Sequence, residues 1–329
     1  MIRKTEADVM STWKSIDVGP LVTIRSITYN HAKYIEKALD SFLNQITSFR
    51  FEIIIHDDAS TDGTTDIIRE YAQKYPNIII PIIQTENQYS KHNGGIVKAI
   101  NPNIHGKYVA LCEGDDYWTD SLKLEKQVKY METHPECSMT IHAVDYVQNG
   151  RVVKVDRISQ MECNIDPNEI IEGGGMYCAT PSICCKTELF LNYPKWRAIA
   201  TVGDYPLQIL AAINGTVHYF PEVMGAYRYM TSDGWSQRQK MIAIGNDRRK
   251  NEIEWLSLLD EESRGAYHQA IVNRIAFYAP VLFKSGGIDG KQAFQYISRM
   301  SLNPQKIIFY LSIFKNYFRN KKMRKSLEL

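Results

Sequence analysis

The stretch Phe51-Glu52-Ile53-Ile54-Ile55-His56-Asp57-Asp58 joins a β-branched apolar run to two consecutive acidic residues. A second apolar run, Lys107–Cys112, leads in the same way into Glu113-Gly114-Asp115-Asp116. Short apolar runs of this kind are typical of buried strands. Each acidic cluster therefore follows the carboxyl end of a predicted strand. That edge is where open α/β sheets bind ligands, so these stretches predict both the fold class and the place of a site.

Outward from these stretches, strand-like and helix-like segments alternate along residues 21–147. The helix-like segments carry apolar residues at helical spacing. The order β-α-β-α predicts an α/β fold with a Rossmann-like, mainly parallel sheet and helices on both faces. The predicted strands are Leu21–Ser26, Phe51–Ile55, Ile78–Ile83 and Tyr108–Cys112, and the predicted helices are Tyr34–Ile46, Thr64–Tyr75 and Ser121–Glu132.

After residue 136 the pattern becomes mixed. Asn149-Gly150 predicts a hairpin with a type I′ turn, and Gly173–Gly175 predicts a loop. We expect a catalytic domain over residues 1–235 and a helical region over 236–329. The helices predicted in that region are Ile242–Leu259, Tyr267–Phe283, Lys291–Met300 and Pro304–Tyr317.

The composition is that of a soluble globular protein. Apolar residues make up 44% and charged residues 23% of the 329, and a net charge of +2 gives no argument for nucleic acid. The N-terminus has no apolar signal region, and no stretch reaches the roughly eighteen apolar residues of a membrane span. We expect a cytoplasmic protein, soluble or peripheral on the membrane, with reduced thiols. The six cysteines lack metal-finger spacing and are Cys112, Cys137, Cys163, Cys178, Cys184 and Cys185.

The first acidic cluster has several interpretations. Counted from Asp58 as an EF-hand loop, position twelve is Arg69, where a bidentate Glu is needed, so that interpretation fails. Ser60–Gly63 fits a turn and helix cap. Two consecutive acids at a strand end need a compensating partner. Asp57 and Asp58 could supply acceptor oxygens to a ligand such as the N–H of a pyrimidine base, or they could belong to the turn.

The second cluster places three carboxylates, Glu113, Asp115 and Asp116, within four residues. A bound Mg²⁺ or Mn²⁺ would remove their repulsion and could hold a diphosphate through its oxygens. The alternative is an acidic surface loop that caps the helix beginning near Thr119. The aromatic Tyr117 and Trp118 favour a site, because large aromatic residues often line a sugar or base. The residues thus indicate a nucleotide-sugar site.

Taken together, Val22–Asn30, Asp57-Asp58 and Glu113–Asp116 resemble the inverting family 2 glycosyltransferases with a GT-A fold, over roughly residues 20–235. The sequence Glu113–Asp120, followed by Leu122–Gln127, resembles the members of this family that make bacterial capsule and O-antigen polysaccharides. Glu113 stands where the common DxD motif has its first Asp. The resemblance implies transfer from a nucleotide-diphosphate donor, a UDP-sugar by the Asp58 correspondence. It implies as acceptor a saccharide, such as one linked to polyprenyl diphosphate.

The resemblance also implies roles for individual residues. Asp204, in Val202-Gly203-Asp204-Tyr205, corresponds to the catalytic base; as an alternative it could cap the helix Tyr205–Ile213. Asp58 corresponds to the residue that binds uracil, and Arg228 is expected at the diphosphate. The nucleotide-binding set is Thr28, Tyr29, Asn30, Asp57, Asp58, Asn87, Lys91 and Asp115; the metal set for Mn²⁺ or Mg²⁺ is Asp116, Asp115 and Glu113; the acceptor or sugar set is Tyr117 and Trp118.

Rival functions meet obstacles in the sequence. A sugar-nucleotidyltransferase needs a glycine-rich loop after the first strand, which Ile27–His31 lacks, and Gly173–Gly175 is not the GxGxxG of a dehydrogenase. The alternative from another class is a catalytically inactive nucleotide- or sugar-binding scaffold of the same fold. Residues 307–325 combine apolar and basic side chains. They could form a core-packing helix with a basic tail, or a membrane-surface or oligomer contact.

Overall fold

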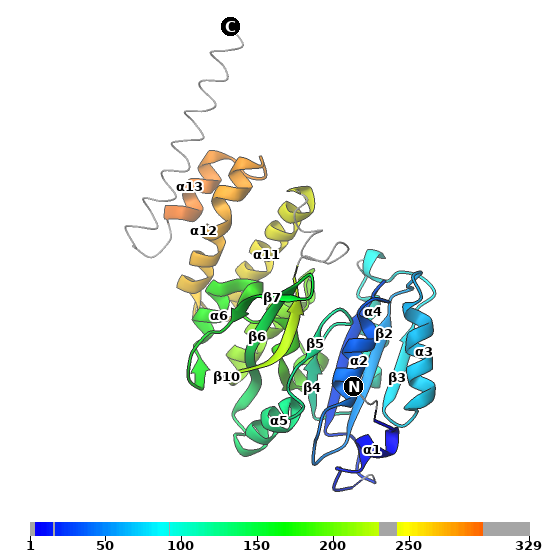
Figure 1. Ribbon diagram of the computed structural model, residues 1–329. Helices are drawn as coiled ribbons and strands as arrows, with labels where there is room; N and C mark the ends of the chain where they lie inside the picture. The colour runs from blue at the N-terminus through cyan, green and yellow to red at the C-terminus, as the bar shows by residue number, and fades with distance from the viewer. Residues whose placement is uncertain (1–3, 16, 92, 230–241, 299–329) are drawn as a thin grey trace. The chain divides into compact units, whose positions relative to one another are not determined.

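The computed structural model describes residues 4–15, 17–91, 93–229 and 242–298 (Figure 1). The predicted helix Pro304–Tyr317 and the basic segment 307–325 lie outside these residues. The chain divides into two compact units. Within the described residues, the first unit contains those in 4–166, 175–193 and 204–229, and the second contains 167–174, 194–203 and 242–298. The prediction of two domains meeting at residue 235 did not include the two inserted segments of the second unit.

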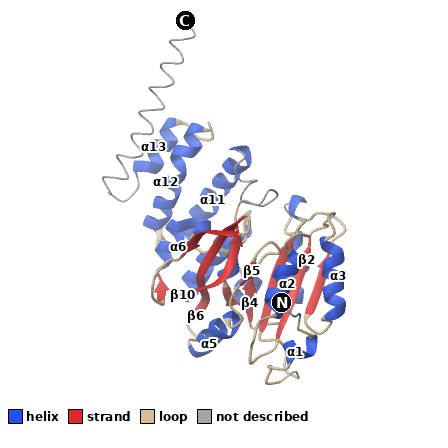
Figure 2. Ribbon diagram, in the orientation of Figure 1, coloured by secondary structure: helices blue, strands red, loops and turns tan. Residues whose placement is uncertain are grey.

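The first unit is built on a ten-stranded sheet (Figure 2). Its main path runs β3-β2-β1-β4-β9-β6-β10-β5, with β7 paired to β6 and β8 paired to β10. The strands are β1 (Val22–Thr28), β2 (Phe51–Asp57), β3 (Ile79–Ile83), β4 (Tyr108–Leu111), β5 (Tyr117–Trp118), β6 (Cys137–Gln148), β7 (Arg151–Asp156), β8 (Cys163–Ile165), β9 (Cys184–Lys186) and β10 (Thr216–Arg228).

The first four strands of the path, β3, β2, β1 and β4, are parallel to one another. The short strand β9 runs antiparallel between β4 and β6, and β6 pairs in parallel with β10. Every residue of β2 is buried, which requires cover on both faces of the sheet. The predicted α/β fold with a mainly parallel sheet is therefore confirmed.

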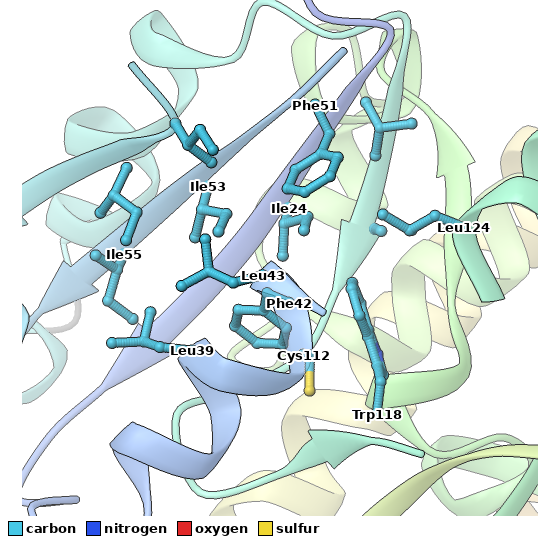
Figure 3. Packing of buried hydrophobic residues seen from close by; sticks show 14 of the residues in the cluster. Ile24, Leu39, Phe42, Leu43, Phe51, Ile53, Ile55, Cys112, Trp118 and Leu124 are labelled. Atoms are coloured by element: carbon cyan, nitrogen blue, oxygen red, sulfur yellow. The ribbon is translucent and has the colours of Figure 1, made fainter. Parts of the chain in front are cut away.

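The helices of the first unit cover this sheet and connect its strands. They are α1 (Glu6–Met10), α2 (Ile35–Leu43), α3 (Thr64–Lys74), α4 (Gly95–Ile100), α5 (Lys123–Thr133), α7 (Glu188–Leu191) and α9 (Asp204–Asn214), with 3₁₀ turns η1 (Tyr89–Lys91), η2 (Asn101–Asn103) and η4 (Thr180–Ser182). Helix α2 shows why the predictions succeeded. Ile35, Leu39 and Phe42 recur at helical spacing and are fully buried, and they pack against strand residues such as Ile24 (Figure 3). Apolar burial of this kind contributes about 1.5–3 kcal/mol for each large side chain.

The turn predictions divide into a correct one and a wrong one. Asn149 and Gly150 have φ values of 50° and 77° between β6 and β7, as a type I′ turn requires. The predicted loop Gly173–Gly175 is instead the end of helix α6 (Pro167–Gly173) and the start of the 3₁₀ turn η3 (Gly174–Met176). Glycine composition alone predicted a loop, but a helix ends there and a 3₁₀ turn begins.

The second unit is helical where it is described. It contains α6, α8 (Lys195–Ala198), α11 (Ile242–Glu262), α12 (His268–Lys284) and α13 (Gly290–Ser298). The last three agree with the helices predicted from the sequence. Trp196 stacks on Trp255 with ring centroids 5.8 Å apart. The buried Glu252 accepts hydrogen bonds from Arg274 Nε (2.9 Å) and from the Tyr278 hydroxyl (2.7 Å). Over the described ranges, no helix combines the length and apolarity needed to cross a membrane. None of the six cysteines, all of which lie in the described ranges, forms a disulfide.

Candidate active site

The two acidic clusters lie at one edge of the sheet, on either side of β1. The backbone N–H of Asp58, just past β2, donates to the carbonyl of Thr28 (3.0 Å). The N–H of Gly114, just past β4, donates to the carbonyl of Ile27 (2.9 Å). Since β2 and β4 are both parallel to β1, their carboxyl ends meet at this edge.

The acids of the first cluster are buried and have protein partners. Asp57 is fully buried and accepts hydrogen bonds from the hydroxyls of Ser60 and Thr65. Asp58 is 1% exposed, and its two oxygens accept the backbone N–H groups of Gln88 (2.7 Å) and Tyr89 (3.0 Å). The compensating partners for these charges thus come from the protein itself. Contact of Asp57 and Asp58 with a nucleotide stays a prediction.

The segment 84–91, which follows β3, closes over the first cluster. Asn87 donates its side-chain N–H to the Asp58 carbonyl (3.3 Å) and accepts the N–H of Ser90 (2.8 Å). Lys91 is exposed, and its Nζ lies 2.5 Å from an oxygen of Glu86. Asn87 is therefore part of the loop framework, whereas Lys91 is accessible from solvent.

The end of β1 is cross-linked to the turn after β2. Asn30 adopts a left-handed backbone with φ of 56°, its N–H donates to Ser60 Oγ (2.9 Å), and its side-chain oxygen accepts the N–H of Thr61 (2.8 Å). Tyr29, next to it, is partly buried. Thr28 is 1% exposed, and its hydroxyl finds no hydrogen-bond partner among the described residues. Thr28, Tyr29 and Asn30 thus lie beside the first cluster, at the predicted nucleotide position.

Glu113 begins the second cluster and points back at β1. One of its oxygens accepts the backbone N–H of Ile27 (2.7 Å). Burial raises the pKa of the Glu113 carboxyl to about 7, and the nearby guanidinium of Arg25 opposes that shift. The next residue, Gly114, is required by close packing: a Cβ there would lie 2.7 Å from Thr28 Oγ1 and 2.8 Å from Thr28 Cβ.

Asp115 and Asp116 differ in exposure. Asp116 is 1% exposed, and one oxygen accepts the backbone N–H of Arg228 (2.7 Å). Burial, followed by the charge of Asp115, raises the pKa of Asp116 well above its usual value. The Asp115 carboxylate is 20% exposed and lies 3.9 Å from His31 Nε2. Three carboxylates lie close together here and that of Asp115 is partly exposed, in contrast to the two buried acids of the first cluster.

Arg228 holds the second cluster from the other side. Its guanidinium donates to the Asp115 carbonyl and lies over two aromatic rings, 4.8 Å from the centroid of Tyr34 and 4.7 Å from that of Tyr117. The Nζ of Lys37 lies 3.5 Å from the same Tyr117 ring. Such cation–π contacts hold a guanidinium in place, and its remaining N–H groups can bind anions. Two cations thus lie beside the acidic cluster.

The two aromatic residues expected at a sugar have different positions. Tyr117 is partly exposed, between Lys37 and Arg228. Trp118 is 4% exposed, packs against Phe42 with centroids 4.8 Å apart, and belongs to the hydrophobic core (Figure 3). The expectation that Trp118 lines a sugar site is therefore corrected: its indole serves the core, and only Tyr117 remains a candidate for sugar contact.

Asp204 is the first residue of α9 and is partly exposed. One of its carboxylate oxygens accepts the backbone N–H of Tyr205 (2.8 Å), and the other lies 3.5 Å from the hydroxyl of Thr180. Its charge is among those that raise the pKa of Glu113, so Asp204 lies near the second cluster although ninety residues separate the two in sequence. Asp204 thus lies in the first turn of the helix, where a carboxylate is favoured, but its bond to the next residue's N–H is not the N2 or N3 bond of an N-cap.

The sequence matches the Glycosyl transferase family 2 model over residues 23–184, which includes both acidic clusters. An uncharacterised protein of Mycobacterium tuberculosis is 36% identical over 282 residues, which cover 82% of this chain and 77% of that protein. The chain belongs to glycosyl transferase family 2.

Further similarities concern shorter stretches or the fold alone. The Escherichia coli UDP-Glc:alpha-D-GlcNAc-diphosphoundecaprenol beta-1,3-glucosyltransferase WfaP is 36% identical over 113 residues, 34% of this chain and 42% of that enzyme. The crystal structure of S. aureus TarS 1-349 in complex with UDP-GlcNAc matches with a TM-score of 0.56 and 15% identity, over 91% of this chain and 92% of TarS 1-349. The Pyrobaculum calidifontis mannosyltransferase PcManGT in complex with GDP-Man and Mn²⁺ matches with a TM-score of 0.50 and 17% identity, over 89% and 85% of the chains. These structures share the GT-A fold of this glycosyltransferase.

The structure adds residues to the glycosyltransferase site that the sequence did not single out. His31 lies near Asp115, Arg25 near Glu113, and Tyr34 under Arg228. A signal was available for His31, since it directly follows the Tyr29-Asn30 pair at the end of β1. Arg25 was a second signal, because a charged residue within an apolar strand needs a partner.

Proposed function

We propose that this glycosyltransferase moves a sugar, with inversion, from a UDP-sugar to a saccharide acceptor carried on polyprenyl diphosphate. The observation that carries the proposal is the arrangement at the second cluster. A partly exposed carboxylate, Asp115, lies beside a stacked guanidinium, Arg228, with Asp204 nearby. Carboxylates can hold a metal–diphosphate unit, the guanidinium can bind phosphate, and a separate acid can serve as base.

The acceptor class is supported by the sequence similarities. WfaP is named for a glucosyl transfer to GlcNAc-diphosphoundecaprenol, and it matches this chain over a third of its length. We infer a role in bacterial surface polysaccharide synthesis, as in capsule or O-antigen, and the lipid-linked acceptor in the name of WfaP supports it. A peripheral position on the inner face of the membrane would bring such an acceptor to the site.

In the proposed reaction, Asp204 takes the proton of the acceptor hydroxyl as its oxygen attacks the anomeric carbon. The bond from that carbon to the diphosphate breaks on the opposite face, so an α-linked donor gives a β-linked product. Arg228 stabilises the negative charge that develops on the leaving diphosphate. The partly exposed Tyr117 ring is placed to contact the sugar.

The donor set fits a divalent cation that is shared with the substrate. Over the described ranges, no three Asp, Glu, His or Cys side chains converge as a metal-binding group. Mg²⁺ is usually held by one or two carboxylates together with substrate phosphates, and Asp115 with Asp116 could supply such a pair. Such an ion, Mn²⁺ or Mg²⁺, would neutralise charge on the leaving diphosphate. We keep Asp116 as the proposed main ligand, with Asp115 and Glu113 beside it.

Calorimetric titration of UDP with and without Mn²⁺, on the wild type and on Asp116→Asn, tests the proposal. Metal-dependent binding that the variant loses is the expected result. At a hundredfold excess over Kd, UDP should stabilise the fold by about 2.7 kcal/mol. A screen of UDP-glucose, UDP-GlcNAc and GDP-mannose against a GlcNAc-diphospholipid would then identify donor and acceptor.

Other outcomes would change the proposal in defined ways. Binding of GDP instead of UDP would overturn the base assignment and leave the reaction class in place. Nucleotide binding with no turnover in any donor–acceptor pair would favour the inactive scaffold. Retained turnover in Asp204→Asn would remove Asp204 as base.

A further inference from the structure

Each of the three residues of the 3₁₀ turn η4 makes a contact with the side chain of a residue elsewhere in the chain. Thr180 Oγ1 reaches Asp204 Oδ2 (3.5 Å). The Pro181 carbonyl accepts the indole N–H of Trp118 (2.9 Å). The Ser182 carbonyl accepts a side-chain N–H of Gln127 (2.9 Å). This turn therefore lies between the second acidic cluster, which ends two residues before Trp118, and the proposed base.

A second bond connects the same segment to the helix of the base. Gln208 is on α9, one helical turn after Asp204, and is fully buried. Its side-chain N–H donates to the Cys178 carbonyl (3.3 Å). Residues i and i+4 share one face of a helix, so Asp204 and Gln208 both face the segment 178–182. Movement of this segment would therefore move the amino end of α9.

Gln127 is held in one orientation by a buried cation. Lys123 and Gln127 are both fully buried, and Lys123 Nζ donates to Gln127 Oε1 (2.7 Å). An ammonium has only donors, so the amide must turn its oxygen toward Lys123 and its NH₂ toward Ser182 and Thr140. Lys123 Nζ also lies 4.1 Å from the Trp118 ring centroid. The cation thus contacts both donors that hold η4.

Packing alone does not account for this cluster. Burying an ammonium and an amide is costly, and apolar side chains of similar volume would fill the space at lower free energy. Buried polar networks can fix one arrangement of the groups that they bond. Here the bonded groups are two consecutive carbonyls, beside the Thr180 hydroxyl that lies 3.5 Å from Asp204.

We propose that Trp118 and Gln127, oriented by Lys123, are positioning residues: they couple the acidic loop 113–118 to the turn 178–182 and so hold Asp204 in place. The inference rests on the proposed function, because it takes the loop as the nucleotide side and Asp204 as the base. It gives Trp118 a role in the site without any contact to substrate.

Hydrogen exchange measured by mass spectrometry on the full chain, with UDP and Mn²⁺ as the probe, tests the coupling. In the wild type, UDP should slow exchange in peptides that cover 178–183. The expected change is about two- to twelvefold, the range of one hydrogen bond of about 0.5–1.5 kcal/mol. Trp118→Phe keeps an aromatic ring and removes the indole N–H. It should lose this change while binding UDP with wild-type affinity.

Tyr71→Phe is the matched control. It also removes one hydrogen bond from a buried ring, that of the Tyr71 hydroxyl to Asp40 (2.7 Å), but on α3. It should keep the UDP-dependent change at 178–183. If Trp118→Phe fails to fold, Thr180→Val replaces it. That variant should lower kcat and leave the donor KM unchanged, and Thr180→Ser, which keeps the hydroxyl, should restore kcat.

The outcomes separate the two proposals. If UDP binds and the exchange of 178–183 does not respond, or responds equally in Trp118→Phe, the coupling is overturned and the proposed function stands. If neither UDP nor GDP binds, the proposed function falls and the coupling falls with it. If Thr180→Val lowers stability with no change in kcat, η4 serves the fold alone.

Discussion

The two acidic clusters look alike in the sequence and differ in the structure. Both follow strands that pair in parallel with β1. Asp57 and Asp58 are bonded by hydroxyls and backbone N–H groups of their own protein. Asp115 and Asp116 crowd together, and the raised pKa of Asp116 reflects burial and like charge. Buried acids whose oxygens are bonded within the protein stabilise a loop, whereas the partly exposed Asp115 beside Asp116 remains available to a cation.

The largest expected effect comes from neutralising the second cluster. Asp116→Asn should lower turnover by roughly a hundredfold or more, because a bound cation supplies several kcal/mol of charge stabilisation. The thermal stability of the nucleotide-free protein should not fall in parallel, because the substitution removes repulsion from Asp115. Steady-state kinetics and thermal unfolding of the same preparation check both parts. A large loss of stability would show that Asp116 serves the fold, as the acids of the first cluster do.

The first cluster should respond in the opposite way. Asp57→Asn should destabilise the fold by about 1.5–3 kcal/mol, the range of hydrogen bonds to charged groups, because Ser60 and Thr65 lose a charged acceptor. Urea unfolding measures the change. Unaltered stability together with abolished UDP binding would break the comparison, since Asp57 would then serve the ligand.

A pair of glycines, one in each cluster, sharpens the contrast. Gly114→Ala would place a Cβ against Thr28 and should cost about 1–3 kcal/mol by overpacking. It should also weaken metal-dependent UDP binding, because the loop that carries Asp115 must shift. Gly63→Ala faces open space at φ of +98° and should cost about 1–2 kcal/mol of backbone strain, with UDP affinity kept. Equal losses of affinity would show that both loops position ligand groups.

The sequence predicted what local patterns encode. The β-branched run at Phe51 and the Asn149-Gly150 turn fold as expected, because periodicity and turn chemistry are local. It missed β9, since Cys184–Lys186 is too short to show a period and forms only between β4 and β6. The partners of Asp58 were also missed, because Gln88 and Tyr89 approach it only after β3 is in place.

The misassignment of Trp118 has a similar cause. An aromatic residue after an acidic turn predicts a side chain that lines a sugar site. In the structure, however, the two-residue strand β5 pairs with β10, and Trp118 points into the core. Tyr117, one residue earlier, then faces the opposite way. A single residue of register therefore separates a core side chain, Trp118, from a partly exposed one, Tyr117, and sequence alone does not fix that register.

The smallest predicted effect concerns Arg228, the cationic side chain beside the second cluster. Arg228→Lys keeps the charge but loses the planar group that lies over Tyr34 and Tyr117. We expect the Kd for UDP with Mn²⁺ to rise by about five- to tenfold, close to 1 kcal/mol, because a stacked guanidinium presents fixed donors to phosphate. Uridine, which lacks the phosphates, is the control ligand and should show no change. A larger loss of affinity for uridine than for UDP would mean that Arg228 acts by holding the loop through Asp115. The second cluster would then resemble the first, because its charged groups would serve the fold more than the ligand.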